Sequence, residues 1–384
     1  MADSPAVLML PRSAAVCEAP AAALGHTGRP GRCGRAAAGA SRTAALRRMR
    51  IAGFTGPPCA GTVRALRSAR MARAILCVGT TPALQRVMVF ERLLPGEVNR
   101  ARQTLDGVAG KSVNVAKVLR ALGGRPCAVG LVGPQRGVLL RQVLEARGID
   151  CDFVPVAAET RQCVTLIDEA TGVVTELVEE SRAVEPEAYE RLIRLVQRRL
   201  AGCRAAIMSG TIATGGPPDL YARCVRLARD ARALAVVDAA GPALAEALKA
   251  RPDLVKPNQA ELMATVGRSL PDEPSVWSAM REVGERGAGR VVVTAGAKPT
   301  LAWDGKQGWR LTPPSIKALN PIGSGDAFTA ALVLRLMRGD DLGEACRWGA
   351  AAGAADALSL LAGEVERADV ERLAERVTVE HVSI

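Results

Sequence analysis

Short apolar runs and longer stretches with helical spacing alternate along most of the chain. The short runs, which are typical of buried strands, lie at about 75–79, 128–132, 205–208, 234–238, 254–256 and 291–294. The stretches with helical spacing lie at about 112–122, 136–146, 186–200, 217–230, 242–250, 258–266 and 274–286. Strand–helix alternation predicts an α/β fold with a mainly parallel sheet covered on both faces, and with ligands at the carboxyl ends of the strands.

Two pairs of strands do not fit this rhythm. One pair lies near 85–105, with a turn at about 93–98 between its strands. The other pair comprises 162–167 and 172–178, joined by a turn at 170–172. We expect these segments, near 85–105 and 160–178, to form a small sheet at the edge of the active site, where it could act as a lid.

The charge of the chain is concentrated in its first 70 residues. They hold eleven arginines and two acidic residues, a net charge of +9 out of the formal +12 of the whole chain. The remainder is close to neutral, so we expect no nucleic-acid partner. Residues 1–70 are rich in Ala, Arg, Gly and Pro and lack sustained periodicity, so they could be a disordered tail, a targeting peptide or a start placed too early. We favour a true start at Met71 or Met49, and we assign the folded domain to residues 71–384.

The amino-acid composition narrows the class of protein further. Apolar residues make up 48% of the chain and aromatic residues 3%, which favours a globular protein over a disordered one. The apolar runs are too short to predict a membrane span. The ten cysteines form no CxxC pair and the only histidines are His26 and His381, so neither a zinc site nor a Ser-His-Asp triad is expected. Cysteines in apolar strands, such as Cys77, are typical of a reducing compartment, so we expect a cytoplasmic protein.

The stretch 320–328, Asn-Pro-Ile-Gly-Ser-Gly-Asp-Ala-Phe, combines a tight turn with the start of a long apolar run. Pro321 prevents an earlier helix start, so the pattern predicts a buried helix that opens at about Asp326 and ends near Gly339. Free N–H groups at a helix start suit a phosphate, and Gly323 and Gly325 permit close approach of the backbone to it.

Asp326 would then lie beside an anion hole, where its carboxylate can accept a proton from an attacking hydroxyl. An ordinary turn and helix cap would use the same residue types, so the motif alone leaves both interpretations open.

A second glycine-containing loop precedes the helix predicted from about residue 112. Its Gly110-Lys111-Ser112 tripeptide is not a P-loop, because Leu105 stands where that motif requires glycine. Lys111 could contact an anion and Asn114 could bond sugar hydroxyls. A capping loop with a solvated lysine remains the alternative at this point.

Several motifs along residues 75–375 together resemble PfkB-type carbohydrate kinases of the ribokinase-like fold, in the branch of 1-phosphofructokinase and tagatose-6-phosphate kinase. The stretch 109–116 corresponds to that branch's Gly-Gly-Lys-Gly-x-Asn-Val-Ala, 256–261 to Lys-Pro-Asn-x-x-Glu, and 320–326 to Asn-Pro-Val-Gly-Ala/Ser-Gly-Asp. Weaker counterparts, in family order, are 81–85, 94–100, 160–161, 209–211 and 294–297. The resemblance implies a three-layer α/β/α fold with a mainly parallel central sheet and a small β-sheet lid.

The resemblance also implies roles for individual residues, with ATP and Mg²⁺ as cofactors and a sugar phosphate as substrate. Asp326 would be the catalytic proton acceptor, and Gly323, Ser324 and Gly325 would form the anion hole. The residues implied for the sugar phosphate are Gln85, Gly110, Lys111, Asn114, Arg161 and Ser209. Those implied for ATP are Lys256, Asn258, Thr294, Gly296, Ala297, Gly323, Gly325, Gly353 and Asp356. Glu261 would hold Mg²⁺ through water, and the lids of two subunits would pair in a homodimer.

The sugar-binding half departs from the family pattern. Gln85 replaces an acid, and Thr81, Ala109 and Ser112 replace Asn, Gly and Gly. Three functions therefore stay open: a kinase of fructose 1-phosphate, fructose 6-phosphate or tagatose 6-phosphate; a kinase of an unphosphorylated sugar or nucleoside; and a catalytically silent sugar-phosphate-binding protein. Lys111 and Arg161 favour the first, because an uncharged substrate needs neither cation.

Overall fold

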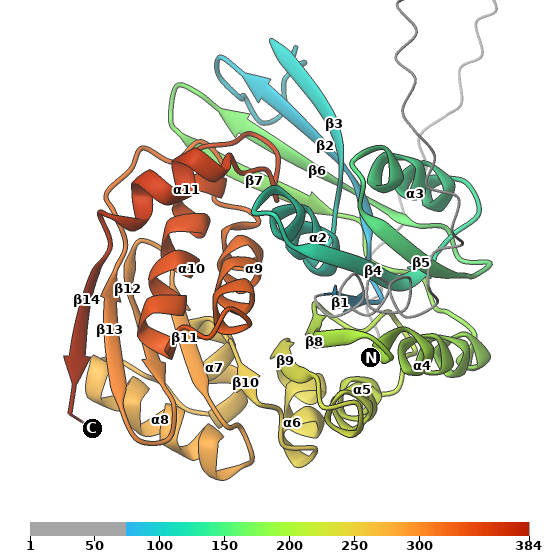
Figure 1. Cartoon of the computed structure of the whole chain (residues 1–384). Coiled ribbons are helices and arrows are strands. Elements are labelled where there is room, and N and C mark those ends of the chain that lie inside the picture. The colour runs from blue at the N-terminus through green and yellow to red at the C-terminus, as the bar shows by residue number, and fades with distance from the viewer. Residues whose placement is uncertain (1–73, 384) are drawn as a thin grey trace, which may run out of the picture. The chain divides into compact units, whose positions relative to one another are not determined.

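The structure is a computed structural model that describes residues 74–383 (Figure 1). The prediction for residues 1–70 lies outside these described residues. Ten strands form the central sheet: β1 (Ala74–Gly79), β4 (Arg125–Val132), β5 (Asp150–Pro155), β8 (Cys203–Ser209), β9 (Leu234–Asp238), β10 (Leu254–Val255), β11 (Val291–Ala295), β12 (Lys298–Trp303), β13 (Gly308–Thr312) and β14 (Thr378–Val382).

The strand order is β14-β13-β12-β11-β10-β9-β8-β1-β4-β5. Neighbouring strands from β5 to β11 pair in parallel, and β11 to β14 pair antiparallel. The expected mainly parallel sheet is therefore confirmed. The sequence reading missed β5 and β12–β14, because these strands at the two sides of the sheet carry polar residues and lack a continuous apolar run.

Ten helices of the described chain cover the two faces of this sheet. One face carries α2 (Lys111–Ala121), α3 (Arg136–Ala146), α9 (Ser324–Leu336), α10 (Leu342–Asp356) and α11 (Arg367–Ala374). The other carries α4 (Pro186–Leu200), α5 (Leu220–Asp230), α6 (Gly241–Lys249), α7 (Gln259–Val266) and α8 (Glu273–Glu285).

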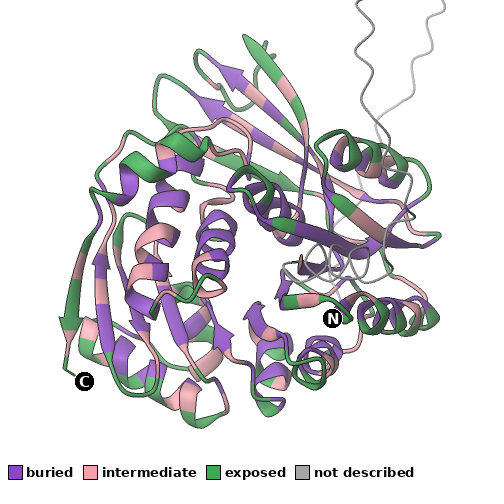
Figure 2. Cartoon of the chain, viewed as in Figure 1, coloured by how far each residue is buried: buried purple, intermediate pink, exposed green. Residues whose placement is uncertain are grey.

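Alternate residues of each strand supply two separate apolar cores, because successive side chains of a strand point to opposite faces. In β1, Ile75 and Cys77 pack with the α2–α9–α10 layer, whereas Leu76 and Val78 pack with the α4–α8 layer. Figure 2 shows the inner strands of this sheet largely buried, whereas the edge strand β14 is exposed or half-buried. The three-layer α/β/α arrangement implied by the resemblance is thereby confirmed.

The two irregular strand pairs form one four-stranded sheet, here called the lid sheet. It comprises β2 (Ala83–Phe90), β3 (Gln103–Ala109), β6 (Arg161–Asp168) and β7 (Val173–Val178), in the order β3-β2-β6-β7. The turn at 94–97 is present, with the Glu97 N–H donating to the Leu94 carbonyl. The strand expected directly after it is absent from 98–102, because Asn99 closes a loop there by bonding both backbone groups of Leu94.

Two features of the C-terminal part differ from expectation. Helix α9 begins at Ser324 rather than at about Asp326, because Gly323 takes the left-handed N-cap conformation and releases the chain into the helix two residues earlier. Helices α10 and α11 were not predicted. The alanine- and glycine-rich sequence of α10 is buried on most sides and shows little periodicity, and α11 has only eight residues. In the part of the chain that the structure describes, no helix has the length and apolarity required to cross a membrane.

Candidate active site

The turn before α9 places backbone N–H groups and Asp326 at one point of the structure. Gly323 has φ +96, and an added Cβ there would lie 2.7 Å from the Cβ of Ala362, so the position requires glycine. The amides of Gly323 and Gly325 donate no hydrogen bond to a described residue. Asp326 is the third residue of the helix and is 6% exposed. This arrangement suits an anion held by the helix start, with a carboxylate beside it.

Asn114 of α2 is the direct partner of Asp326. Its Nδ2 donates to Asp326 Oδ2 at 2.8 Å, across 212 residues of sequence. Gly110 is the N-cap of α2, and its φ of +103 and its closeness to Pro82 and the Thr81 carbonyl leave no room for a Cβ. Burial is the largest influence on the pKa of Asp326 and raises it, as does Asp238, whereas Lys111, Asn114 and Lys256 lower it. The net result is a pKa of about 7. A carboxylate with a pKa near 7 suits a general base.

A second group of charges lies beside this carboxylate. Asp238, at the end of β9, is 1% exposed and accepts from Lys111 Nζ at 3.3 Å, Lys256 Nζ at 3.1 Å and Thr329 Oγ1 at 2.7 Å. Burial disfavours its charge, but the two ammonium groups outweigh that effect and lower the pKa of Asp238 to about 2. Lys111 Nζ also lies 3.2 Å from Glu261 Oε1, and these carboxylates, Asp238 foremost, raise the pKa of Lys111.

The residues implied for ATP lie around the ends of β10 and β11 and along α10. Asn258 caps α7, and it exchanges side-chain and backbone hydrogen bonds with Glu261. It also forms an isolated bridge with Thr294 of β11. Gly296 and Ala297 are exposed in the turn between β11 and β12.

Gly353 and Asp356 of α10 pack against the turn before α9, which contains Gly323 and Ser324. A Cβ at Gly353 would lie 3.0 Å from the Ser324 carbonyl, so α9 and α10 pack closely here. Asp356 accepts from the Gly363 N–H at 2.7 Å, and its Oδ2 lies beside Gly323. Burial raises the pKa of Asp356, which is 1% exposed, although the Gly363 hydrogen bond opposes that increase.

The residues implied for the sugar phosphate are less closely grouped. Ser209 ends β8 next to Asp238, whereas Arg161 begins β6 and donates to the Thr81 carbonyl at 3.3 Å. Arg161 and Arg182 line a cavity of about 30 Å³. Gln85 of β2 is 2% exposed, with its Nε2 3.5 Å from Thr165 Oγ1 of β6. Lys111, implied for the phosphate, instead faces two carboxylates in this structure.

Buried polar atoms without a hydrogen-bond partner occur among the residues of this candidate site. Five buried side-chain nitrogen or oxygen atoms of the described residues lack a hydrogen-bond partner: Gln85 Oε1, Asn114 Oδ1, Ser209 Oγ, Ser324 Oγ and Asp356 Oδ2. All five belong to residues that the sequence analysis assigned to the site. Burying such an atom without a partner costs free energy, so a cluster of them indicates a place built to bind a polar ligand.

Asp238 and Thr329 are site residues to which the sequence analysis gave no role. Asp238 could have been found as the polar residue that ends a buried strand, since ligands bind at the carboxyl ends of parallel strands. Thr329 carries no comparable indication, because it lies within an apolar helix.

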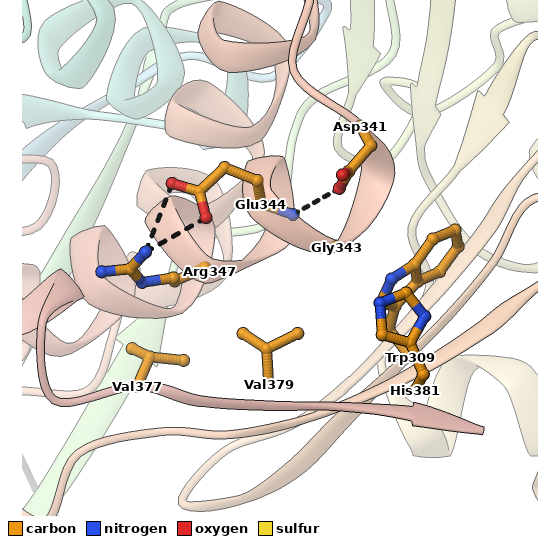
Figure 3. A pocket seen from close by; sticks show the side chains of 8 residues that line it. All are labelled: Trp309, Asp341, Gly343, Glu344, Arg347, Val377, Val379 and His381. Carbon is orange, nitrogen blue, oxygen red and sulfur yellow. Dashed lines mark hydrogen bonds and ion pairs between the residues drawn. The ribbon is translucent and has the colours of Figure 1, made fainter.

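A larger cavity, of about 350 Å³, lies elsewhere, between the first half of α10 and the strands β13 and β14 (Figure 3). None of the assigned site residues lines it. Its charged groups already have partners, since Asp341 caps α10 and Glu344 bonds Arg347. The residues that the sequence analysis assigned to the reaction lie at the head of α9 and not in this cavity.

Comparison with known proteins identifies the family of proteins to which this fold and this site belong. Residues 72–366 match the family described as pfkB family carbohydrate kinase, and the chain belongs to that family. A 1-phosphofructokinase from Rhodobacter capsulatus is 32% identical over 280 residues, which make up 72% of this chain and 88% of that protein. The resemblance seen in the motifs is thus confirmed, and the chain is an ATP-dependent carbohydrate kinase.

Solved structures agree with this assignment. Phosphofructokinase-2 from Escherichia coli, in complex with substrates and products, superposes with a TM-score of 0.73 at 27% identity, over 79% of this chain and 98% of that chain. A possible 1-phosphofructokinase from Thermotoga maritima superposes with a TM-score of 0.75, over 81% of this chain and 100% of that chain. At 23% identity the latter supports the fold alone.

Proposed function

We propose that this kinase transfers the terminal phosphoryl group of ATP to a hydroxyl of a phosphorylated ketohexose, with fructose 1-phosphate, fructose 6-phosphate and tagatose 6-phosphate as the candidates. The observation that carries the proposal is the pairing of Asp326 with Asn114 beside the Gly323 turn. The relatives named as 1-phosphofructokinase and phosphofructokinase-2 support a substrate that already carries a phosphate.

In this proposal the phosphoryl transfer takes place at the N-terminus of α9. Asp326 accepts the hydroxyl proton, and the amides around Gly323, Ser324 and Gly325 stabilise charge on the transferring group. Lys256 adds a positive charge there, since its Nζ lies 3.7 Å from where a Cβ of Gly325 would be. Asn258, Thr294, Gly296, Ala297, Gly353 and Asp356 would border the nucleotide.

Mg²⁺ fits this site as an ion carried mainly by phosphates and water. Among the described residues no group of three acidic, histidine or cysteine side chains could hold a metal by itself. Both Glu261 oxygens already accept hydrogen bonds, from Lys111 and from the Asn258 N–H, which favours contact through water over direct ligation. Mg²⁺ commonly binds kinases in this way, with few protein ligands and several waters. Bound there, it would neutralise charge on the phosphates.

For the substrate phosphate we propose Lys111, Arg161 and Ser209, with Gln85, Gly110 and Asn114 towards the sugar. Support comes from the unpartnered Ser209 hydroxyl and from the guanidinium of Arg161 in the small cavity beside Thr81. At about 30 Å³ that cavity has room for a water molecule but not for a phosphate. Binding of a phosphate at Arg161 therefore requires the residues around this cavity to move apart.

A substrate panel tests this proposal. Purified protein with ATP and Mg²⁺ is given the three ketohexose phosphates, the matching free sugars and a nucleoside, and ADP formation is followed by a coupled assay. We expect turnover on at least one ketohexose phosphate, and Asp326→Asn should abolish it while ATP binding remains.

The other outcomes are equally informative. Turnover confined to neutral sugars or nucleosides would replace this proposal with the second function considered above. Binding of sugar phosphate without ADP formation would indicate a catalytically silent protein. Near-normal turnover by Asp326→Asn would remove Asp326 from the chemistry.

We further propose a homodimer formed through the lid sheets, with residues 71–384 as the catalytic domain and residues 1–70 as an extension. The lid sheet carries exposed apolar side chains, including Val173 at 56% and Leu177 at 52%, and Val98 in the loop between β2 and β3 is 81% exposed. Sedimentation analysis of wild type and Leu177→Glu tests the dimer, which the variant should weaken. A cytoplasmic location is consistent with the seven described cysteines, all of which are free thiols.

A further inference from the structure

A buried lysine outside the residues assigned so far joins three elements around the site. Lys117 of α2 is 4% exposed. Its Nζ donates to the carbonyl oxygens of Val108 at 3.0 Å and Ala362 at 2.6 Å, and it lies 3.1 Å from Glu364 Oε1. An ammonium group has three donors, so all of them are used. A buried charge is stable only when it is paired and hydrogen-bonded in this manner.

The two carbonyls belong to segments that lie far apart in the sequence. Val108 is in β3 of the lid sheet, and Ala362 is in the segment 357–364 after α10, here called the post-α10 loop. This loop packs against the turn before α9 that contains Gly323, here called the catalytic turn. A Cβ at Gly323 would lie 2.7 Å from the Cβ of Ala362, and a Cβ at Gly363 would lie 3.0 Å from the Cα of Asn114.

The same loop also contacts the lid sheet. Leu360 and Leu361 pack against the small apolar core of that sheet, which contains Val87, Val89 and Ile167. The post-α10 loop therefore contacts both the lid sheet and the residues beside Asp326, Gly323 and Asn114. A shift of this loop would displace both the lid sheet and the catalytic turn, because closely packed segments transmit strain to one another.

We propose that Lys117 is a positioning residue that couples the lid sheet to the catalytic turn. Its ammonium group holds the Val108 and Ala362 carbonyls together, so the post-α10 loop stays pressed against Gly323 and Asn114. Lys117 touches none of the groups assigned to the reaction. The inference rests on the kinase activity of the family but not on which sugar phosphate is the substrate. Burial lowers the pKa of Lys117 while Glu364 opposes the decrease, so the neighbouring oxygens are needed to keep this amine charged.

The test compares Lys117→Met, which keeps the length of the side chain and removes its donors, with Arg147→Met. Arg147 pairs with Glu364 but contacts neither carbonyl, so its variant removes an ion pair beside the same carboxylate. We expect Lys117→Met to lower kcat about ten- to a hundredfold, with KM for ATP changed little, because small displacements at a catalytic centre have effects of this size. Arg147→Met should stay within about twofold of wild type.

Hydrogen–deuterium exchange separates positioning from simple loss of stability and does not depend on activity. In Lys117→Met, exchange should accelerate in both 103–110 and 318–328, although Lys117 forms no hydrogen bond or ion pair with the second segment, and exchange in α4 should not change. A kcat per folded molecule within about twofold of wild type, or faster exchange confined to α2, would overturn the proposal. If Lys117→Met does not fold, Lys117→Gln, whose amide can satisfy one carbonyl, is measured in the same way and judged by the same outcomes.

Discussion

The hydrogen bond between Asn114 and Asp326 makes the pH dependence of turnover a sensitive test of the site. Asp326 can accept a proton only when it is ionised, so kcat/KM should fall as the pH drops below the pKa of this carboxyl, which is about 7. Replacing Asn114 with leucine removes the 2.8 Å donor to Oδ2. The ionised form loses a stabilising partner, and the pKa of Asp326 rises.

The size of this increase follows from the strength of the bond. A hydrogen bond to a charged group contributes about 1.5–3 kcal/mol, and one pKa unit corresponds to about 1.4 kcal/mol. Because a protonated carboxyl can also bond an amide, we take the lower end and expect an increase of about one unit. At pH 7 the ionised fraction would then fall from about one half to about one tenth.

The assay is the coupled measurement of ADP formation between pH 5.5 and about 9.5, with subsaturating sugar phosphate, for wild type and Asn114→Leu. The substrate phosphate titrates identically in both reactions, so a difference between the two profiles belongs to the enzyme. The plateau can also drop, since Asn114 is proposed to face the sugar, but the midpoint is a separate parameter. Asp326→Asn serves as the control, because any residual rate should lack the titration of Asp326 and keep only that of the substrate phosphate. An unchanged or lower midpoint in Asn114→Leu would refute the reasoning.

Two further predictions concern the charges beside Asp326. Lys111→Ala should mainly raise KM for the sugar phosphate, as expected for lost ground-state binding; an increase confined to KM for ATP would assign the ammonium to the nucleotide, and two unchanged KM values would remove it from binding. Asp238→Asn should lower the free energy of unfolding in urea by about 3–5 kcal/mol at neutral pH, because Lys256, 3% exposed, loses the only ion pair that it forms with a described residue. The pKa of Asp238 is lower when folded, about 2, than its ordinary value of 3.8, so the stability it contributes is present above pH 4 and is lost towards pH 2. A loss below about 1 kcal/mol would contradict this account.

The candidate site was more predictable than its internal contacts. The turn at Gly323 and the loop at Gly110 were recognisable because each combines glycines with a following apolar helix, and both glycines have positive φ. The start of α9 was misplaced by two residues, because the N-cap is set by the conformation of Gly323 and not by the first acidic residue. Lys111 was expected to contact the substrate phosphate, and in this structure it lies between two carboxylates contributed by β9 and α7.

By itself the sequence determined the alternation of strands and helices, the four strands of the lid and the glycine turn that carries Asp326. These features depend on local backbone preferences and on the periodicity of apolar side chains, both of which are written in consecutive residues. Only the tertiary structure decided that Asn114 meets Asp326, that Asp238 joins Lys111 to Lys256, and that Lys117 holds the post-α10 loop. Those contacts depend on the strand order, which brings the carboxyl ends of distant strands together, and local spacing carries no record of that order.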